Sequence, residues 1–348
     1  MKIVCNIKMD NETIESIASF QFRDLHPDLF IGTASDRYAG WMGQIYTEER
    51  FGRNITRRSK KVGGKTFREE VLPVQSVEEY FRHFRILELD FTFYLPILDK
   101  DEKPTWVFHL LRSYRQHIKK GDRIILKAPQ VIFARKILRQ GKYIDNEQYL
   151  NPGVFIKQFY EPAIELLAPW LEGIVFEQEY QRKGNRVSPE DQAAELDAFF
   201  GAIPADNRYH VELRTEALLT GPVFKVLEGY GVGQVLSHWT WLPALSKQFA
   251  LSGKRFLNRN SCIIRLMTPK GMRYEDAYAR AHPFNALIKG MQSPEMVQDT
   301  TELIKRAIEE KVRMNVIVNN RAGGNAPLIA QQIAREFLAA PELTVMKP

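Results

Sequence analysis

Cysteine is scarce in this chain. Only Cys5 and Cys262 occur among 348 residues, far apart and without any paired spacing. This pattern argues against a disulfide framework and against a zinc site built from cysteines. We therefore expect a protein of a reducing compartment, the cytoplasm.

Long apolar runs and histidines are also few. No run approaches the roughly 18 residues that a membrane-spanning helix needs. The first residues, MKIVCNIKMDNETIES, carry acids where an export signal would have an unbroken apolar core. Of the 7 histidines, only His238 is expected at the end of a strand. We therefore expect no membrane association, and nothing indicates a histidine-based metal centre.

Short β-branched or apolar runs alternate with segments of helical spacing through most of the chain. The runs expected to be strands are residues 29–34, 86–94, 123–129, 173–178, 208–213, 233–239, 261–267 and 314–320. Apolar residues recur at helical intervals in 76–84, 105–121, 155–171, 189–203, 217–231, 241–253 and 294–311. Alternating strands and helices form parallel sheets, and eight such units without a linker predict one closed (β/α)8 barrel of the TIM type.

We expect this barrel domain over residues 29–342, with an N-terminal extension at 1–28 packed on it and a tail at 343–348. The first connection between strand and helix is enlarged by a basic stretch, ERFGRNITRRSKKVGGKTFREE (49–70), which carries much of the net charge of +7. Such a stretch is either a contact for phosphates or an acidic partner, or a solvated loop.

The tract 267–294 follows the seventh predicted strand and is long for a connection. Long segments of this kind are often functional. It is either a lid over the barrel mouth, with Tyr274 and Tyr278 as contacts, or a surface excursion with its own short helix.

Charged and polar residues stand near the carboxyl ends of most predicted strands. In a (β/α)8 barrel these ends meet at one rim, where active sites form. A buried charge costs several kcal/mol unless it is paired, so the set predicts a shared polar chamber. The alternative is that the charges only neutralise each other inside the barrel. The candidate substrate-binding residues are Thr33, Tyr38, Trp41, Thr92, Tyr94, Lys127, Arg214, His238, Trp239, Arg265, Asn319 and Asn320.

Four carboxylates at these strand ends are candidates for general acid or base catalysis. They are Glu88, Asp90, Glu177 and Glu212. Glu88 and Asp90, at a spacing of two, would share one face of the second strand together with Thr92. Crowded acids separate in pKa, so Glu88 beside Asp90 is the preferred acid–base pair.

The eighth predicted strand runs into VIVNNRAGGNAP (316–327), which precedes a helical pattern. Gly323 and Gly324 would allow a tight turn with exposed N–H groups, and Asn325 can cap the following helix. Free N–H groups at a helix start attract anions such as phosphate. The segment is therefore either an anion seat or an ordinary turn and cap.

The motifs IGTASDRYAGWMGQIY, ELDFTFY, KAP, VELR and NNRAGGNAP occur in this order over about residues 29–340. Together they resemble the YecE-like family of TIM-barrel proteins, domain of unknown function seventy-two, whose biochemical role is largely unassigned. The resemblance implies the barrel fold. It places on signature positions Gly32, Thr33, Tyr38, Trp41, Gly43, Tyr46, Glu88, Thr92, Tyr94, Lys127, Glu212, Arg214, Arg265, Asn319 and Asn320.

The chain departs from the family pattern at several points. Ser-Asp-Arg stands at 35–37 where Ser-Gly-Trp is typical, and Asp90 replaces an asparagine. FEQEY at 176–180 brings two further acids. These changes favour a cavity whose charge differs from that of a typical family member.

Three functions fit these features. The first is an enzyme that acts on a small polar or anionic molecule, for instance a phosphate-bearing one, by carboxylate acid–base chemistry. The second is a nucleic-acid-binding or nuclease-like barrel, supported by the basic residues and by Trp239 and Trp241, on which bases can stack. The third is a non-catalytic ligand-binding protein. No cofactor is indicated, although carboxylates can also hold a divalent metal such as magnesium or manganese.

Overall fold

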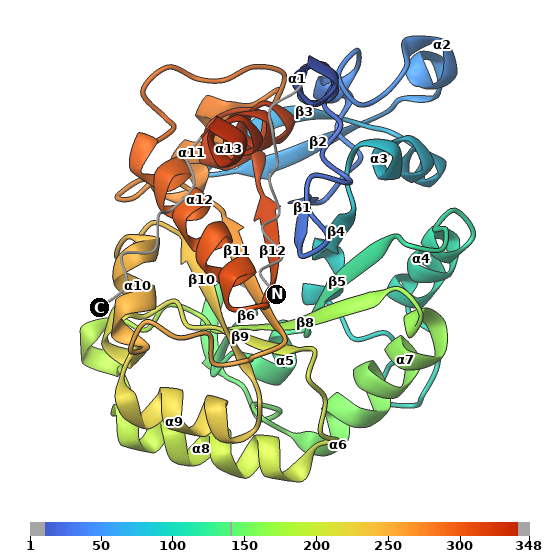
Figure 1. Ribbon diagram of the computed structural model, residues 1–348. Coiled ribbons are helices and arrows are strands. Elements are labelled where there is room, and N and C mark those ends of the chain that lie inside the picture. Colours follow the sequence, from blue (N-terminus) through green and yellow to red (C-terminus); the bar gives the residue numbers. More distant parts are fainter. Residues whose placement is uncertain (1–10, 140, 340–348) are drawn as a thin grey trace, which may run out of the picture.

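A computed structural model describes residues 11–139 and 141–339 of the chain (Figure 1). Eight parallel strands close into a barrel in the order β1-β12-β11-β10-β9-β8-β5-β4, which confirms the predicted (β/α)8 class. These strands are β1 (Leu29–Ala34), β4 (Ile86–Leu89), β5 (Arg123–Lys127), β8 (Leu171–Glu177), β9 (Tyr209–Glu212), β10 (Gly233–His238), β11 (Ser261–Leu266) and β12 (Arg313–Val318).

Helices surround the barrel and connect its strands (Figure 1). The α-helices are α1 (Asn11–Ala18), α2 (Glu48–Phe51), α3 (Val77–His83), α4 (Trp106–Arg115), α5 (Gln130–Phe133), α6 (Pro152–Phe155), α7 (Glu161–Leu167), α8 (Pro189–Ala202), α9 (Gly221–Gly229), α10 (Leu245–Leu251), α11 (Tyr274–Ala281), α12 (Pro294–Glu309) and α13 (Ala326–Ala339). The 3-10 turns are η1 (Ala39–Trp41), η2 (Gly52–Asn54), η3 (Val74–Ser76), η4 (Asp90–Phe93), η6 (Lys183–Asn185), η7 (Glu216–Leu218) and η8 (Asn320–Ala322), and η5 (Ile156–Tyr160) is a π-helical turn.

The barrel interior is layered because side chains alternate between the two faces of each strand. One cluster of apolar side chains fills its middle, including Phe30, Ile86, Ile125, Val175, Val235, Ile263 and Ile317. Two residues further along four of these strands, the corresponding positions are Glu88, Lys127, Glu177 and Arg265, all buried. Because every second side chain of a strand points into the barrel, these four charged residues form a layer at the rim, next to the apolar layer.

The basic stretch 49–70 is more ordered than a solvated loop. It contains β2 (Thr56–Val62) and β3 (Lys65–Val71), which pair as an antiparallel hairpin. Gly63 and Gly64 make the turn with φ angles of 56° and 78°, a conformation that glycine adopts without strain. The enlarged first connection is therefore a folded excursion.

Three of the six basic side chains of this hairpin form ion pairs within it. Arg57 pairs with Glu70 and Arg58 with Glu69, each at 2.9 Å across the two strands. Lys60 also contacts Glu69, at 3.0 Å. Among the described residues, Lys61, Lys65 and Arg68 have no ion pair, so the pairing reduces the positive charge of the hairpin without removing it.

The tract 267–294 contains the short helix α11, which packs against the hairpin. The Tyr278 hydroxyl donates a hydrogen bond of 2.7 Å to Glu69. The Phe67 ring meets the Tyr278 ring edge-on, with centroids 5.1 Å apart. We call the β2–β3 hairpin together with α11 the roof, because these two elements lie side by side at one end of the barrel (Figure 1).

The second predicted strand, 86–94, is shorter than expected. It ends at Leu89, and the chain turns into η4. The Thr92 hydroxyl contacts the carbonyl oxygens of Leu89 and Lys127 at 3.1 and 2.8 Å, which favours the turn over further strand pairing. Glu88, Asp90 and Thr92 therefore do not share a strand face.

Two other local features differ from the sequence prediction. The fifth barrel strand ends at Glu212, one residue before the predicted end at 213, and Arg214 lies in the loop beyond it. A second hairpin, β6 (Lys136–Arg139) and β7 (Lys142–Asp145), follows β5 and had no apolar alternation strong enough to predict it.

The described part of the N-terminal extension contacts the last helix of the barrel. Gln331 on α13 donates a hydrogen bond of 3.0 Å to the carbonyl of Ile17 on α1. Residues 1–10 and the expected tail 343–348 lie outside the described residues. Among residues 11–139 and 141–339, no helix has the length and apolar character needed to cross a membrane.

Candidate functional site

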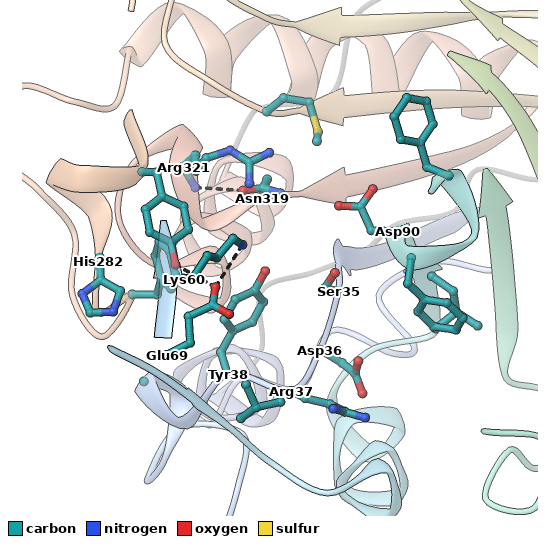
Figure 2. Close-up of a pocket in the computed structure, with 18 of the residues that line it drawn as sticks. Ser35, Asp36, Arg37, Tyr38, Lys60, Glu69, Asp90, His282, Asn319 and Arg321 are labelled. Atoms are coloured by element: carbon teal, nitrogen blue, oxygen red, sulfur yellow. Dashed lines mark hydrogen bonds and ion pairs between the residues drawn. The ribbon is translucent and has the colours of Figure 1, made fainter. Parts of the chain in front are cut away.

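A cavity of about 980 Å³ lies at the carboxyl ends of the barrel strands, and the roof forms part of its wall (Figure 2). Eight arginine or lysine and five aspartate or glutamate side chains line it. Aromatic walls are contributed by Tyr38, Phe93, Tyr94, Trp239 and Tyr274. Such a lining suits a small molecule that has both charged and flat parts.

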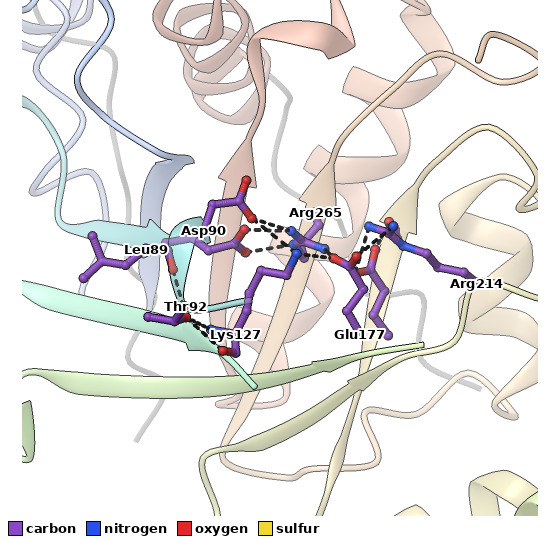
Figure 3. Close-up of polar contacts among 10 residues, drawn as sticks. Leu89, Asp90, Thr92, Lys127, Glu177, Arg214 and Arg265 are labelled. Atoms are coloured by element: carbon purple, nitrogen blue, oxygen red, sulfur yellow. Dashed lines mark hydrogen bonds and ion pairs between the residues drawn. The ribbon is translucent and has the colours of Figure 1, made fainter. Parts of the chain in front are cut away.

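Arg265 on β11 is the centre of the charged layer and is fully buried. Its Nε and Nη2 donate parallel hydrogen bonds of 2.8 and 2.7 Å to the two oxygens of Glu88. Its Nη1 donates to Glu177 at 3.0 Å and also to Glu212 (Figure 3). Glu212 accepts a further hydrogen bond from Ser237 Oγ at 2.6 Å. One arginine therefore joins carboxylates from three strands.

Glu177, at the end of β8, is held by two cations besides Arg265. Lys127 Nζ lies 2.5 Å from one carboxylate oxygen, and Arg214 Nη1 lies 2.9 Å from the other. The Arg214 guanidinium also lies over the Trp239 ring, 4.9 Å from its centroid. These contacts immobilise Glu177 and leave it little capacity for new hydrogen bonds.

Asp90 is placed differently from the other carboxylates. Its side chain is 24% exposed, and its Oδ1 lies 3.3 Å from Lys127 Nζ and 4.0 Å from Arg265 Nη2. Thr92 fixes the turn that carries it, because the Thr92 hydroxyl accepts the Lys127 N–H at 3.0 Å. Asp90 therefore faces the cavity from a turn that Thr92 holds in place (Figure 2).

The carboxylates of the layer separate in pKa as expected for crowded acids. Burial raises the pKa of Glu88, and the charge of Arg265 offsets this only in part. Burial also opposes ionisation of Asp90, but Lys127 and Arg265 outweigh it and hold its pKa below the usual range. For Glu177 the same competition, against Arg214 and Lys127, lowers the pKa strongly. Asp90 and Glu177 are therefore ionised at neutral pH.

The structure brings nine of the predicted site residues to the cavity lining. They are Tyr38, Asp90, Tyr94, Lys127, Glu177, Arg214, Trp239, Arg265 and Asn319. Glu88 and Glu212 are fully buried behind this lining and support Arg265. Their position indicates a positioning role rather than contact with a ligand.

Several predicted binding residues serve the framework instead. The Trp41 Nε1–H donates to Asn320 Oδ1 at 3.0 Å, which joins the first connection to the turn after β12. The Thr33 N–H donates to the Tyr80 hydroxyl at 2.8 Å inside the protein. Burial lowers the pKa of His238 to about 4, so this side chain is neutral. None of these residues belongs to the cavity lining.

The turn after β12 uses its backbone donors internally. The N–H groups of Gly323 and Gly324 donate to the carbonyl of Asn320 at 3.3 and 2.6 Å. Asn325 Oδ1 accepts a backbone N–H of the first turn of α13 at 2.9 Å. A Cβ atom on Gly324 would stand 2.3 Å from the Ala286 carbonyl oxygen, so backbone covers the turn. Of the two alternatives for this segment, the geometry favours the turn and cap, since Gly323, Gly324 and Asn325 do not line the cavity.

Sequence reasoning missed several lining residues. Arg321 follows the asparagine pair at the end of β12, and Asp36 follows β1 in the first connection. Glu69 comes from the β2–β3 hairpin, which the sequence did not predict. Arg321 and Asp36 could have been predicted as lining residues because they lie close to the ends of strands. The sequence around Glu69 did not indicate that this residue folds back over the mouth of the barrel.

A metal site has no ready cluster of ligands in this arrangement. Within the described ranges, no group of three or more histidine, cysteine, aspartate or glutamate residues is placed to hold a metal ion. The four candidate carboxylates face arginine and lysine instead. The sequence indicated no cofactor and left a carboxylate-bound divalent metal open, and the described residues add no candidate cluster for one.

A family model described as "Protein of unknown function DUF72" matches residues 30–347. The chain belongs to the DUF72 family. A DUF72 family protein from Enterococcus faecalis superposes with a TM-score of 0.56 at 14% identity, over 90% of this chain and 96% of that one. One from Thermotoga maritima gives 0.51 at 15% identity, over 90% and 99%. A comparison with curated protein sequences gives no match.

These relationships confirm the resemblance inferred from the motifs. At identities this low, the likeness to the two DUF72 structures shows the fold alone. A shared fold does not determine function, so the chemistry of this DUF72 chain depends on the residues of its own cavity.

Proposed function

We propose that this DUF72 protein is an enzyme that binds a small polar, anionic molecule beside the roof and transfers a proton with the Asp90 carboxylate. The observation that carries the proposal is the position of Asp90. Of the four candidate carboxylates, it combines an exposed edge in the cavity with a cation, Lys127, at 3.3 Å.

The other three carboxylates are less suited to this role. Glu88 and Glu212 are fully buried behind Arg265. Glu177 is held by three cations, with a side chain only 6% exposed and a pKa far below the usual range. A general base must reach the proton that it takes, at about 2.6–3.2 Å, and Asp90 is the carboxylate that meets this condition without a rearrangement of the charged layer.

The chemistry follows from the neighbours of Asp90. An ionised carboxylate takes a proton from a bound substrate, and the electron pair of the broken bond stays on the substrate. The Lys127 ammonium, next to Asp90, stabilises the negative charge that develops there. The fixed layer of Arg265 and its partners holds both groups in place, so little reorganisation accompanies the step.

The charge of the lining supports an anionic ligand. The eight basic side chains exceed the five acidic ones. The aromatic side chains around them provide flat surfaces for the rest of the molecule. An anionic metabolite of modest size therefore matches the cavity better than a neutral or cationic one.

Two alternatives have their own support. A non-catalytic ligand-binding role is consistent with the saturation of Glu177, Glu88 and Glu212 by cations. A nucleic-acid-binding role is supported by the basic stretch 49–70, in which Arg57 and Arg58 pair with Glu70 and Glu69. These two ion pairs reduce the charge that the stretch offers to a polymer, so we favour a small anion bound in the cavity.

The test is an unbiased search for turnover. Purified protein is incubated with a metabolite extract, and the loss and gain of compounds is followed by mass spectrometry. We expect at least one anionic compound to be consumed by the native protein and to remain unchanged with Asp90→Asn. Small molecules that co-purify with Asp90→Asn should include this compound, since the variant retains the rest of the cavity.

A matched control is Glu70→Gln. Glu70 also lines the cavity, but it lies on the hairpin and pairs with Arg57. We expect this variant to consume the same compound as the native protein. If the native protein changes no compound, or if Asp90→Asn acts as fast as the native protein, the enzymatic proposal is wrong.

A further inference from the structure

We propose that Arg321, together with Asn319, forms the anion-recognition point of the cavity and takes a carboxylate or phosphoryl group of the ligand. This inference rests on the proposed small-molecule function and assigns the part of the cavity that selects the ligand. It also replaces the glycine turn as the place where the segment NNRAGGNAP meets an anion.

Arg321 differs from most of the basic side chains of the lining, because those have carboxylate partners. Arg58, Arg214 and Arg265 each have a carboxylate partner at 2.9 Å or less. Across residues 11–139 and 141–339, no carboxylate lies within 4.0 Å of the Arg321 guanidinium. A half-buried arginine without a counter-ion attracts an anionic ligand more strongly than one that is already paired.

Two further lining arginines lack an ion pair, but their surroundings differ. Arg68 is exposed on the hairpin, so water screens its charge. Arg37 interacts with the Tyr114 hydroxyl and lies beside Asp36, a neighbouring carboxylate. Arg321 is the member of the three whose Nε is buried without a hydrogen-bond partner.

Asn319 supplies a second unused donor at the same place. Its Oδ1 accepts the Arg321 backbone N–H at 3.0 Å, and this bond fixes which way the amide group points. Its Nδ2 is buried and has no hydrogen-bond partner, although the residue is only 1% exposed and belongs to the cavity lining. A buried amide donor without a partner costs stability, and a ligand oxygen would satisfy it.

The roof holds the Arg321 guanidinium in position. The group lies over the Tyr274 ring of α11, 4.6 Å from its centroid. Stacking of this kind restricts the planar guanidinium and leaves its edge free for two parallel hydrogen bonds to a carboxylate or phosphate. Recognition of the anion is thereby coupled to the placement of the roof.

The geometry also relates this point to the proposed reaction. Figure 2 shows Arg321 and Asn319 together on one side of the cavity and Asp90 on the other. Arg321 is close enough to lower the pKa of Asp90 through its charge. A ligand whose anionic group rests on Arg321 therefore presents its remaining part to Asp90 and Lys127.

The experiment measures the binding of simple anions by calorimetry at constant ionic strength. The probes are inorganic phosphate and acetate, and chloride serves as the background salt. We expect the native protein to bind at least one of them and Arg321→Gln to bind it roughly tenfold or more weakly, as charge-assisted hydrogen bonds are lost. A preference for phosphate assigns a phosphoryl ligand, and a preference for acetate assigns a carboxylate.

Arg58→Gln is the matched control, because it removes one positive charge from the same lining where Glu69 already pairs with it. We expect its anion affinity to stay within about twofold of the native value. Arg321→Lys, which keeps the charge but lacks the planar fork, should fall between the native protein and Arg321→Gln.

Three results would overturn the inference: no binding of either anion by the native protein, equal binding by Arg321→Gln, or an equal loss in Arg58→Gln. If turnover depends on Asp90 but the substrate has no anionic group, the anion-recognition role of Arg321 is wrong and the enzymatic proposal stands. If anions bind through Arg321 but no compound is turned over, the enzymatic proposal is wrong and the anion-recognition role stands.

Discussion

Glu88 and Arg265 meet face to face inside the barrel, although their strands β4 and β11 are separated by β1 and β12 around its wall. Both oxygens of the carboxylate accept hydrogen bonds from the guanidinium, at 2.7 and 2.8 Å, and both side chains are fully buried. The pair fixes the plane of the Arg265 guanidinium. In this orientation the Nη1 group of Arg265 donates hydrogen bonds to Glu177 and Glu212.

Replacement of Glu88 by glutamine should therefore damage folding more than chemistry. It leaves the Arg265 charge buried with one partner fewer, and breaking a buried pair in this way costs about 3–5 kcal/mol. We expect the free energy of unfolding, measured by urea denaturation, to fall by that amount. A loss below about 1 kcal/mol would show that Glu88 is not a structural counter-ion.

Asp90→Asn should show the opposite balance. The side chain is partly exposed, and its shortest ion-pair contact, with Lys127, is 3.3 Å. We expect a change of about 1 kcal/mol or less in unfolding free energy, with turnover lower by roughly 100-fold or more. Denaturation and rate measurements on the same preparation would check this contrast with Glu88→Gln. A large loss of stability would instead make Asp90 part of the framework.

Asp36 predicts a dependence of stability on pH. Burial raises its pKa from about 3.8 to about 6, although Tyr114 donates a hydrogen bond of 2.7 Å to its Oδ1. The folded state thus binds the proton more tightly than the unfolded state. Its contribution is most favourable below pH 4 and is lost as the pH rises through 6.

Asp36→Asn should remove this dependence. We expect the variant to gain on the order of 3 kcal/mol over the native protein between pH 4 and pH 8, less any loss from the altered Tyr114 contact. Thermal melts across that range would measure the difference. A difference that does not change with pH would mean that Asp36 keeps an ordinary pKa in the folded protein.

Phe67→Ala should loosen the roof without unfolding the barrel. The Phe67 ring contacts the Tyr278 and His282 rings, with centroids 5.1 and 5.3 Å apart, respectively. We expect amide hydrogen exchange roughly tenfold faster in the hairpin and α11, and unchanged in the barrel strands. Tyr278→Phe, which removes only the hydrogen bond to Glu69, should give a smaller effect. Equal acceleration throughout the barrel would show that the roof and barrel unfold together.

The barrel was predictable from sequence because each strand and helix has a recognisable pattern of apolar residues in its own short segment. Apolar residues recur with a period of two in strands and 3.6 in helices, and both periods can be seen in short segments. Because the carboxyl ends of all barrel strands meet at one rim, charged residues that are distant in sequence are then expected to lie together. The overestimate at 86–94 shows the limit of this reasoning. The alternation continues past Leu89, but the Thr92 hydroxyl competes for the carbonyl groups and turns the chain.

The roof was not predictable in the same way. Its hairpin has charged residues on both strands, and its pairing depends on partners such as Arg58 and Glu69 that recognise each other only once the strands meet. Likewise, sequence grouped Glu88 with Asp90 as candidates of equal standing. Which of them is sealed behind Arg265 and which faces the cavity depends on the turn at η4, a tertiary property.

The bond between Glu69 and Tyr278 joins two segments that are about two hundred positions apart in the chain, yet both border the same chamber. The hairpin and α11 are therefore joined at a contact that forms part of the cavity wall, outside the barrel strands. We expect substitutions at this contact to change how long a ligand stays bound and how large a ligand can enter. The charged layer around Arg265 should remain unchanged in such variants.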